Sequence, residues 1–251
     1  MTVGDAATVR RPPPIPALQK YLLGASLLIA SGLAWALSLH PPGQMSTGTG
    51  SFVAIWTVMM AAMMLPSALP AVSLFATVAK SRRRFGFPAA PSAAFVFGYL
   101  AAWALLGVAV SLTGFLGTPA AHAWSEPVAG AAIALAGAYQ LSRWKSHCLG
   151  HCRSPLNFFM YNWHDGTAGA AVMGAHHGLY CVGCCWGLML ALAALGLMNP
   201  AWMALIALII FAEKVTPAGQ RMALLTGLVL MVTGGVIAFG LVPFHQAAGG
   251  M

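Results

Sequence analysis

Seven long apolar stretches run along the chain, separated by short polar segments or segments rich in glycine and proline. Most approach the roughly 20 residues that a helix needs to cross the hydrocarbon core of a bilayer. The pattern therefore predicts an all-α, polytopic transmembrane helical bundle of about seven spans. The expected spans are 21–39, 52–79, 93–116, 127–141, a fifth that starts between 167 and 178 and ends near 197, 199–217, and 222–241. Residues 1–19 are expected to be a disordered lead, and 20–245 a single transmembrane domain.

Composition agrees with this pattern, because 59% of the residues are hydrophobic, only 6% are charged, and mean hydropathy is +0.80. If seven spans alternate from a cytoplasmic N-terminus, all twelve Lys and Arg residues fall on the cytoplasmic side. Cytoplasmic loops carry an excess of these residues. The net charge of +8 thus indicates topology in a bacterial inner membrane, with lipid as partner, and does not indicate nucleic-acid binding.

The five cysteines lie in two short clusters that also hold four of the eight histidines. Cys148 and Cys152 follow the fourth predicted span, and Cys181, Cys184 and Cys185 belong to the fifth. Cysteine and histidine donors suit a soft or borderline metal ion. The predicted topology places both clusters near the cytoplasmic interface, where thiols stay reduced. The alternative is that these cysteines only pack as small apolar residues.

Helical spacing narrows the candidate ligands. In the fifth span His177, Cys181 and either Cys184 or Cys185 share one face, whereas His176 points elsewhere. Residues 147–152 carry two pairs of candidate ligands four residues apart, His147 with His151 and Cys148 with Cys152. This segment can form either a helix or a turn. The candidate metal ligands are therefore Cys148, His151, Cys152, His177, Cys181, Cys184 and Cys185.

Two further groups are candidates for a supporting role or a metal pathway. The second span carries Met59, Met60, Met63 and Met64, which are either thioether ligands for Cu(I) or fillers of an apolar core. Glu213 and Lys214 end the sixth span, and either face the bundle interior or extend to the interface.

Small residues in the fifth span predict close helix packing. Gly174, Gly178, Gly183 and Gly187 recur along it, and small residues let neighbouring helix backbones approach. We expect this helix to be a central element of the bundle.

Four segments of the chain resemble a bacterial family of predicted metal-binding integral membrane proteins of unknown function. They are residues 56–70 (WTVMMAAMMLPSALP), 148–155 (CLGHCRSP), 177–186 (HGLYCVGCCW) and 213–214 (EK). The resemblance implies a membrane-embedded metal site, and it supplies no substrate. His147 lies outside the family pattern, which leaves its role as a ligand open.

The leading hypothesis is a membrane protein that binds copper, or zinc as second choice, for metal transport, delivery or homeostasis. A soluble metal carrier and a larger membrane complex are the candidate partners. One alternative is a membrane thiol oxidoreductase that uses Cys181 and Cys184, although the cytoplasmic side is reducing. Another is an accessory subunit with a structural metal or a haem. The chain has only four Asp and Glu residues and no phosphate-binding loop, so the sequence does not predict an enzyme.

Overall fold

The computed structural model describes residues 17–39, 49–82, 89–112, 126–156, 159, 163–196 and 199–242. Within these ranges the chain forms eight α-helices and no β-strand, which confirms the predicted all-α class. The helices are α1 (Ala17–Leu39), α2 (Thr49–Arg82), α3 (Ala89–Leu112), α5 (Glu126–Gln140), α6 (Arg143–Arg153), α8 (Gly166–Leu195), α9 (Pro200–Val215) and α10 (Gly219–Ala238). Most of the predicted lead, residues 40–48, residues 113–125 with the end of the predicted third span, and the C-terminus lie outside the described residues.

Five of the described helices, namely α1, α2, α3, α8 and α10, are long and apolar enough to cross a membrane by length and composition. The other two predicted spans correspond to α5 and α9, which have only 15 and 16 residues. At a rise of about 1.5 Å per residue they are about 23 Å long, which is shorter than a hydrocarbon core of about 30 Å. The count of seven spans therefore stays a prediction, and five of the described helices have the length required to cross a membrane.

Local sequence signals explain where the two helices that frame the site begin. Asn199 caps α9 by accepting hydrogen bonds from Ala201 N and Trp202 N, and Pro200 takes the first helical position, as the sequence predicts. Ser142 caps α6, because its side chain accepts a hydrogen bond from Lys145 N. The first cysteine cluster therefore lies on a helix, which decides between the helix and the turn that the sequence left open.

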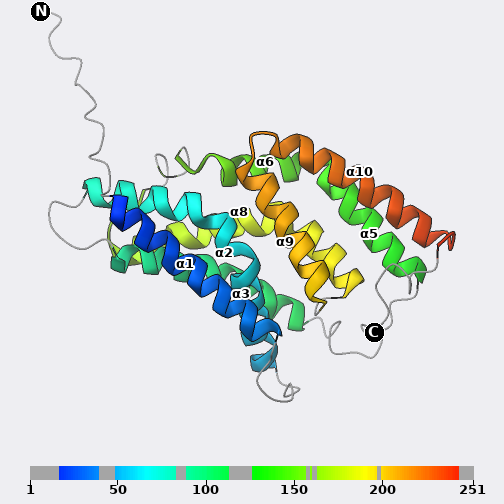
Figure 1. The fold of residues 1–251 in the computed structure, drawn as a ribbon, viewed down its shortest axis with the longest axis horizontal. Helices are drawn as coiled ribbons and strands as arrows, with labels where there is room; N and C mark the ends of the chain where they lie inside the picture. Colours follow the sequence, from blue (N-terminus) through cyan, green and yellow to red (C-terminus); the bar gives the residue numbers. More distant parts are fainter. Residues whose placement is uncertain are drawn as a thin grey trace, which may run out of the picture.

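The long helices form two groups with α8 between them (Figure 1). The blue and cyan helices α1 and α2 lie together with α3 at one end, while α5 and α10 run side by side at the other. Gly174 of α8 lies against the Phe95 carbonyl of α3, and Gly187 lies against the ring of Tyr139 in α5. The predicted central position of the fifth span is confirmed, since its glycines allow contact with both groups.

The cysteines lie deeper along the fifth helix than the sequence suggests. Since α8 already begins at Gly166, Cys181 lies halfway along its 30 residues and away from either end of the helix, while the expected position near the cytoplasmic interface stays a prediction. The helix is about 45 Å long, which exceeds one straight crossing. However, the short helix α5 ends at this level, because the Tyr139 hydroxyl donates to the Gly183 carbonyl. The cysteines thus lie in the middle of a long helix and beside the ends of short ones.

Candidate metal centre

Three thiols of α8 form a compact group, called here the inner sulfur group: Cys181, Cys184 and Cys185. Their Sγ atoms all lie within 4.8 Å of one another, and the Cys184 and Cys185 sulfurs are 3.3 Å apart. Each residue is only 1% exposed, and all are free thiols. The spacing Cys181-x-x-Cys184-Cys185 turns the three side chains toward one side of the helix, away from solvent.

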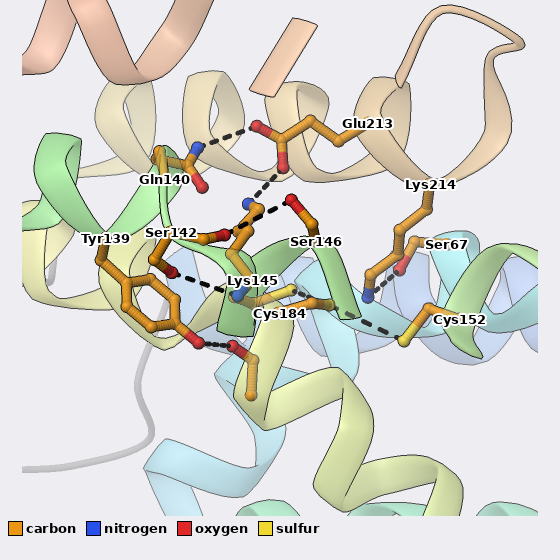
Figure 2. Close-up of polar contacts among 12 residues, drawn as sticks. Ser67, Tyr139, Gln140, Ser142, Lys145, Ser146, Cys152, Cys184, Glu213 and Lys214 are labelled. Atoms are coloured by element: carbon orange, nitrogen blue, oxygen red, sulfur yellow. Dashed lines mark hydrogen bonds and ion pairs between the residues drawn. The ribbon is translucent and has the colours of Figure 1, made fainter. Parts of the chain in front are cut away.

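The two thiols of α6, Cys148 and Cys152, lie directly against this group. The Cys152 Sγ is 3.7 Å from the Cys184 Sγ, a contact drawn in Figure 2. Cys148 packs over Gly183, where an added Cβ would be 2.7 Å from the Cys148 sulfur. Both α6 thiols are half-buried. The two cysteine clusters, 33 residues apart at Cys148 and Cys181, therefore meet in space between α6 and α8.

A half-buried lysine and a buried tyrosine contact the first sulfur of the inner group. Lys214 Nζ donates a hydrogen bond of 2.9 Å to the Cys181 Sγ, and the Tyr99 hydroxyl lies 2.9 Å from the same atom. Lys214 Nζ also donates to the Ser67 Oγ of α2 at 3.3 Å, as Figure 2 shows. Copper held by several thiolates carries net negative charge, and an ammonium group at this distance offsets it in a medium of low dielectric constant.

Glu213, the neighbour of Lys214, makes a separate ion pair on the other side of α9. Its carboxylate accepts a bond of 2.6 Å from Lys145 Nζ of α6 and one of 2.8 Å from Gln140 Nε2 (Figure 2). The two charged side chains are 1% and 2% exposed. Arg153, at the far end of α6, donates to the Glu213 carbonyl at 3.1 Å. These bonds fix α6 to α9, and thereby fix the α6 thiols over the inner sulfur group.

Candidate histidines take different positions. His177 is buried on the cysteine-bearing face of α8, as predicted, and packs near the rings of Phe95 and Tyr99 with centroids 6.0 and 6.1 Å away. Among the described residues, the group of ligand atoms within 4.8 Å of one another contains the three cysteines without His177. His176 is exposed, also as predicted. His151 is half-buried and stacks on Tyr180 at a centroid distance of 4.3 Å.

All four candidate methionines are buried in the apolar core that also holds the inner sulfur group. Met63 and Met64 lie one turn before Ser67, so they occupy the face of α2 that approaches Lys214. Met59 and Met60 continue this face by one more turn. Their core position fits a packing role, and they lie on the same face of α2 as Ser67, which contacts Lys214.

Sequence reasoning missed several residues around the site. Tyr99 and Ser67 gave no signal, because a tyrosine or serine in an apolar helix is common. Lys145 was assigned to a polar connection, but it is buried and paired with Glu213. The sequence does contain a signal for this ion pair. The Glu213 carboxylate lies in an apolar helix and needs a positively charged partner, and the chain has few Lys and Arg residues that could supply it.

The donor set fits a soft metal. Thiolates and thioethers select Cu(I) and zinc over magnesium or calcium. On α6, outside the long helices, partial burial raises the pKa of the Cys148 thiol above its ordinary value. Cys148 must therefore lose a proton when it becomes a ligand, so that metal and proton compete for this sulfur.

Comparison with known proteins gives one informative match. A family model described as PpoB2, copper chaperone, matches residues 53–237, which include both cysteine clusters and the four methionines. No curated protein and no solved structure matches the chain. The family match and the three-cysteine group both support copper as the metal that this chain binds.

Proposed function

Because the chain belongs to the PpoB2 family of copper chaperones, we propose that it is a membrane-spanning chaperone that holds Cu(I) between α8 and α6 and passes it to an acceptor protein. The inner sulfur group supplies the primary thiolate ligands. Cys152 and Cys148 of α6 lie where a further thiolate can bind or replace one of them. His177 and the methionines of α2 are candidates for weaker, secondary contact.

The observation that carries this proposal is the sulfur geometry. Three buried Sγ atoms lie within 4.8 Å of one another, and a fourth, from another helix, lies 3.7 Å from one of them. Buried free thiols usually act as small apolar side chains. Four converging sulfurs with an ammonium group at 2.9 Å from one of them are difficult to explain by packing alone.

The partners around the sulfurs favour copper over zinc. Structural zinc sites use four ligands in a tetrahedron, usually on loops that the ion itself folds. Here the cysteines are held by helix packing, and the same apolar core contains the thioethers of four methionines, a ligand type that suits Cu(I). Zinc therefore serves as the competitor in the test below.

Two features support insertion in a membrane. Large apolar side chains are exposed along the outer faces of α1 and α10, among them Leu22, Ile29, Leu33, Leu225, Val229 and Val232. Soluble monomers rarely expose such continuous apolar surfaces. The basic residues of α6 then lie on the Lys- and Arg-rich side, which we assign to the cytoplasm of a bacterial inner membrane.

The experiment is copper binding by the detergent-purified full chain, loaded anaerobically with Cu(I) in the presence of excess Zn(II). The wild type is expected to retain copper, and a variant with Cys181, Cys184 and Cys185 replaced by serine is expected to lose it while eluting as the same species. Replacing Ser111, a half-buried residue near the C-terminal end of α3 and far along the sequence from either cysteine cluster, by alanine serves as the control. Retention of wild-type copper by the triple variant, or preferential retention of zinc by the wild type, would contradict the proposal.

A further inference from the structure

The outer face of α6 carries a feature that the thiol site does not use. His147 and His151 are four residues apart, so they lie on one side of the helix, opposite the face that holds Lys145 and Leu149 in the core. Their ring centroids are 4.6 Å apart. His147 is exposed and His151 is half-buried. Two imidazoles at this spacing can bind one metal ion together.

Hydrogen bonding prepares His151 as a ligand. Its Nδ1 lies 3.0 Å from the His147 carbonyl oxygen. A carbonyl only accepts, so Nδ1 carries the proton and Nε2 keeps its lone pair. Metal-binding histidines almost always have such a bond from the second ring nitrogen, because it fixes the tautomer and the ring orientation. The parallel stacking on Tyr180, with an interplanar angle of 3°, holds the same ring in place.

Solvent exposure decreases step by step from the histidine pair, through Cys152, to the inner sulfur group. His147 is exposed, while His151 and its chain neighbour Cys152 are half-buried. Cys184, whose sulfur is 3.7 Å from that of Cys152, is fully buried. Cys152 is thus next to His151 in the chain and in contact with Cys184, so it links the histidine pair to the inner sulfur group at the contact between α6 and α8.

We propose that His147 and His151 form an entry site that captures copper from the aqueous side and hands it to the thiols through Cys152. This inference rests on the proposed function for the destination of the metal. Copper stays Cu(I) during the transfer, so no electrons move. The neutral imidazoles leave as sulfur binds, and each thiol that becomes a ligand releases its proton to water. His147, which the family pattern lacks, would be an addition of this chain for faster loading.

The first test measures how fast the purified full chain removes Cu(I) from a coloured chelator, and how much copper it finally holds. Replacing both His147 and His151 by alanine should slow uptake several-fold and leave the final copper content unchanged. His164 is an exposed histidine before α8 and provides the matched control, His164→Ala, which should load at the wild-type rate. Unchanged uptake in the double variant would overturn the inference. Equal loss of rate and final content would also overturn it, because the histidines would then belong to the resident site.

A second measurement separates this inference from the proposed function. In the chain with all five cysteines replaced by serine, Cu(II) is added as the probe and its electron paramagnetic resonance spectrum is recorded. The entry site predicts coupling to imidazole nitrogen, which disappears when His147 and His151 are replaced. If the wild type holds no Cu(I) but this signal is present, the proposed function fails and the entry site stands. If the five-serine chain elutes as wild type yet shows no histidine-dependent signal, the entry site is wrong. If the five-serine chain misfolds, the copper uptake rates of the first test decide whether the entry site exists.

Discussion

The two cysteine-bearing helices differ in how they are held. α8 is apolar throughout, and its glycines lock it between α3 and α5, so that the inner sulfur group is only 1% exposed. α6 has 11 residues and is largely polar; buried Lys145 and Arg153 bond it to α9, and it also packs against α8, where Cys148 lies over Gly183. Under our proposal, the buried thiols of α8 supply the metal affinity and α6 supplies access to them. Each of the following predictions tests how one of these two helices is held in place or how it contributes to copper binding.

The largest effect is expected from breaking the ion pair that holds α6. Replacing Lys145 by methionine leaves the Glu213 carboxylate buried without its cation, which costs about 3–5 kcal/mol in comparable buried pairs. We expect a markedly lower melting temperature and faster copper loss. Arg143→Met removes a positive charge from the exposed side of the same helix and should behave as wild type. Equal melting temperatures for the two variants would show that α6 is held in another way.

The next effect concerns Lys214 and copper affinity. Lys214→Met removes the hydrogen bond to Cys181 and the positive charge beside the sulfurs. Hydrogen bonds to charged groups contribute about 1.5–3 kcal/mol, so Cu(I) affinity should fall by about 10- to 100-fold in a chelator competition assay. Arg221→Met, which removes one exposed positive charge from α10, is the control. An unchanged affinity in Lys214→Met would mean that the charge of the copper complex is offset elsewhere.

A smaller effect is expected where the two helices touch. In Gly183→Ala the new methyl group would lie 2.7 Å from the Cys148 sulfur, so the Cys148 side chain or α6 itself must shift. Overpacking of this kind costs about 1–3 kcal/mol. Gly150→Ala on α6 meets no atom within 4 Å and should gain about 1 kcal/mol of helix propensity. If thermal unfolding ranks the two variants in the opposite order, the close contact between α6 and α8 is incorrect.

The smallest expected effect is on pH dependence. Burial raises the pKa of the Cys148 thiol, so this residue is protonated at neutral pH and releases a proton on binding metal. Copper affinity should therefore fall as pH decreases, and it should fall less steeply in Cys148→Ala. Chelator competition at neutral and mildly acidic pH measures both slopes. Identical slopes would indicate that Cys148 is not a ligand.

Much of the architecture could be predicted because it depends on local signals. Hydropathy identified the long helices, and Asn199 with Pro200 located the start of α9. The glycines of α8 indicated close packing, which Gly174 and Gly187 confirm. Helical spacing also identified the buried face with His177 and the cysteines.

The remaining features depend on contacts between distant parts of the chain. No periodicity reveals that Lys145 pairs with Glu213, or that Tyr99 reaches the sulfur of Cys181. The start of the fifth helix could only be bracketed between 167 and 178, because the apolar stretch is longer than one crossing, whereas α8 starts at Gly166. The metal ligands themselves stay a prediction, since geometry brings sulfurs together without showing what they bind.

X-ray absorption of copper in the anaerobically loaded wild-type chain tests the central claim most directly. The thiol site predicts an edge typical of Cu(I) and a first coordination shell made of sulfur. The Cys181→Ser/Cys184→Ser/Cys185→Ser variant should lose that shell. A first shell of nitrogen or oxygen in the fully loaded wild type would contradict the account, because the buried sulfurs of α8 and α6 would then not be where the copper is held.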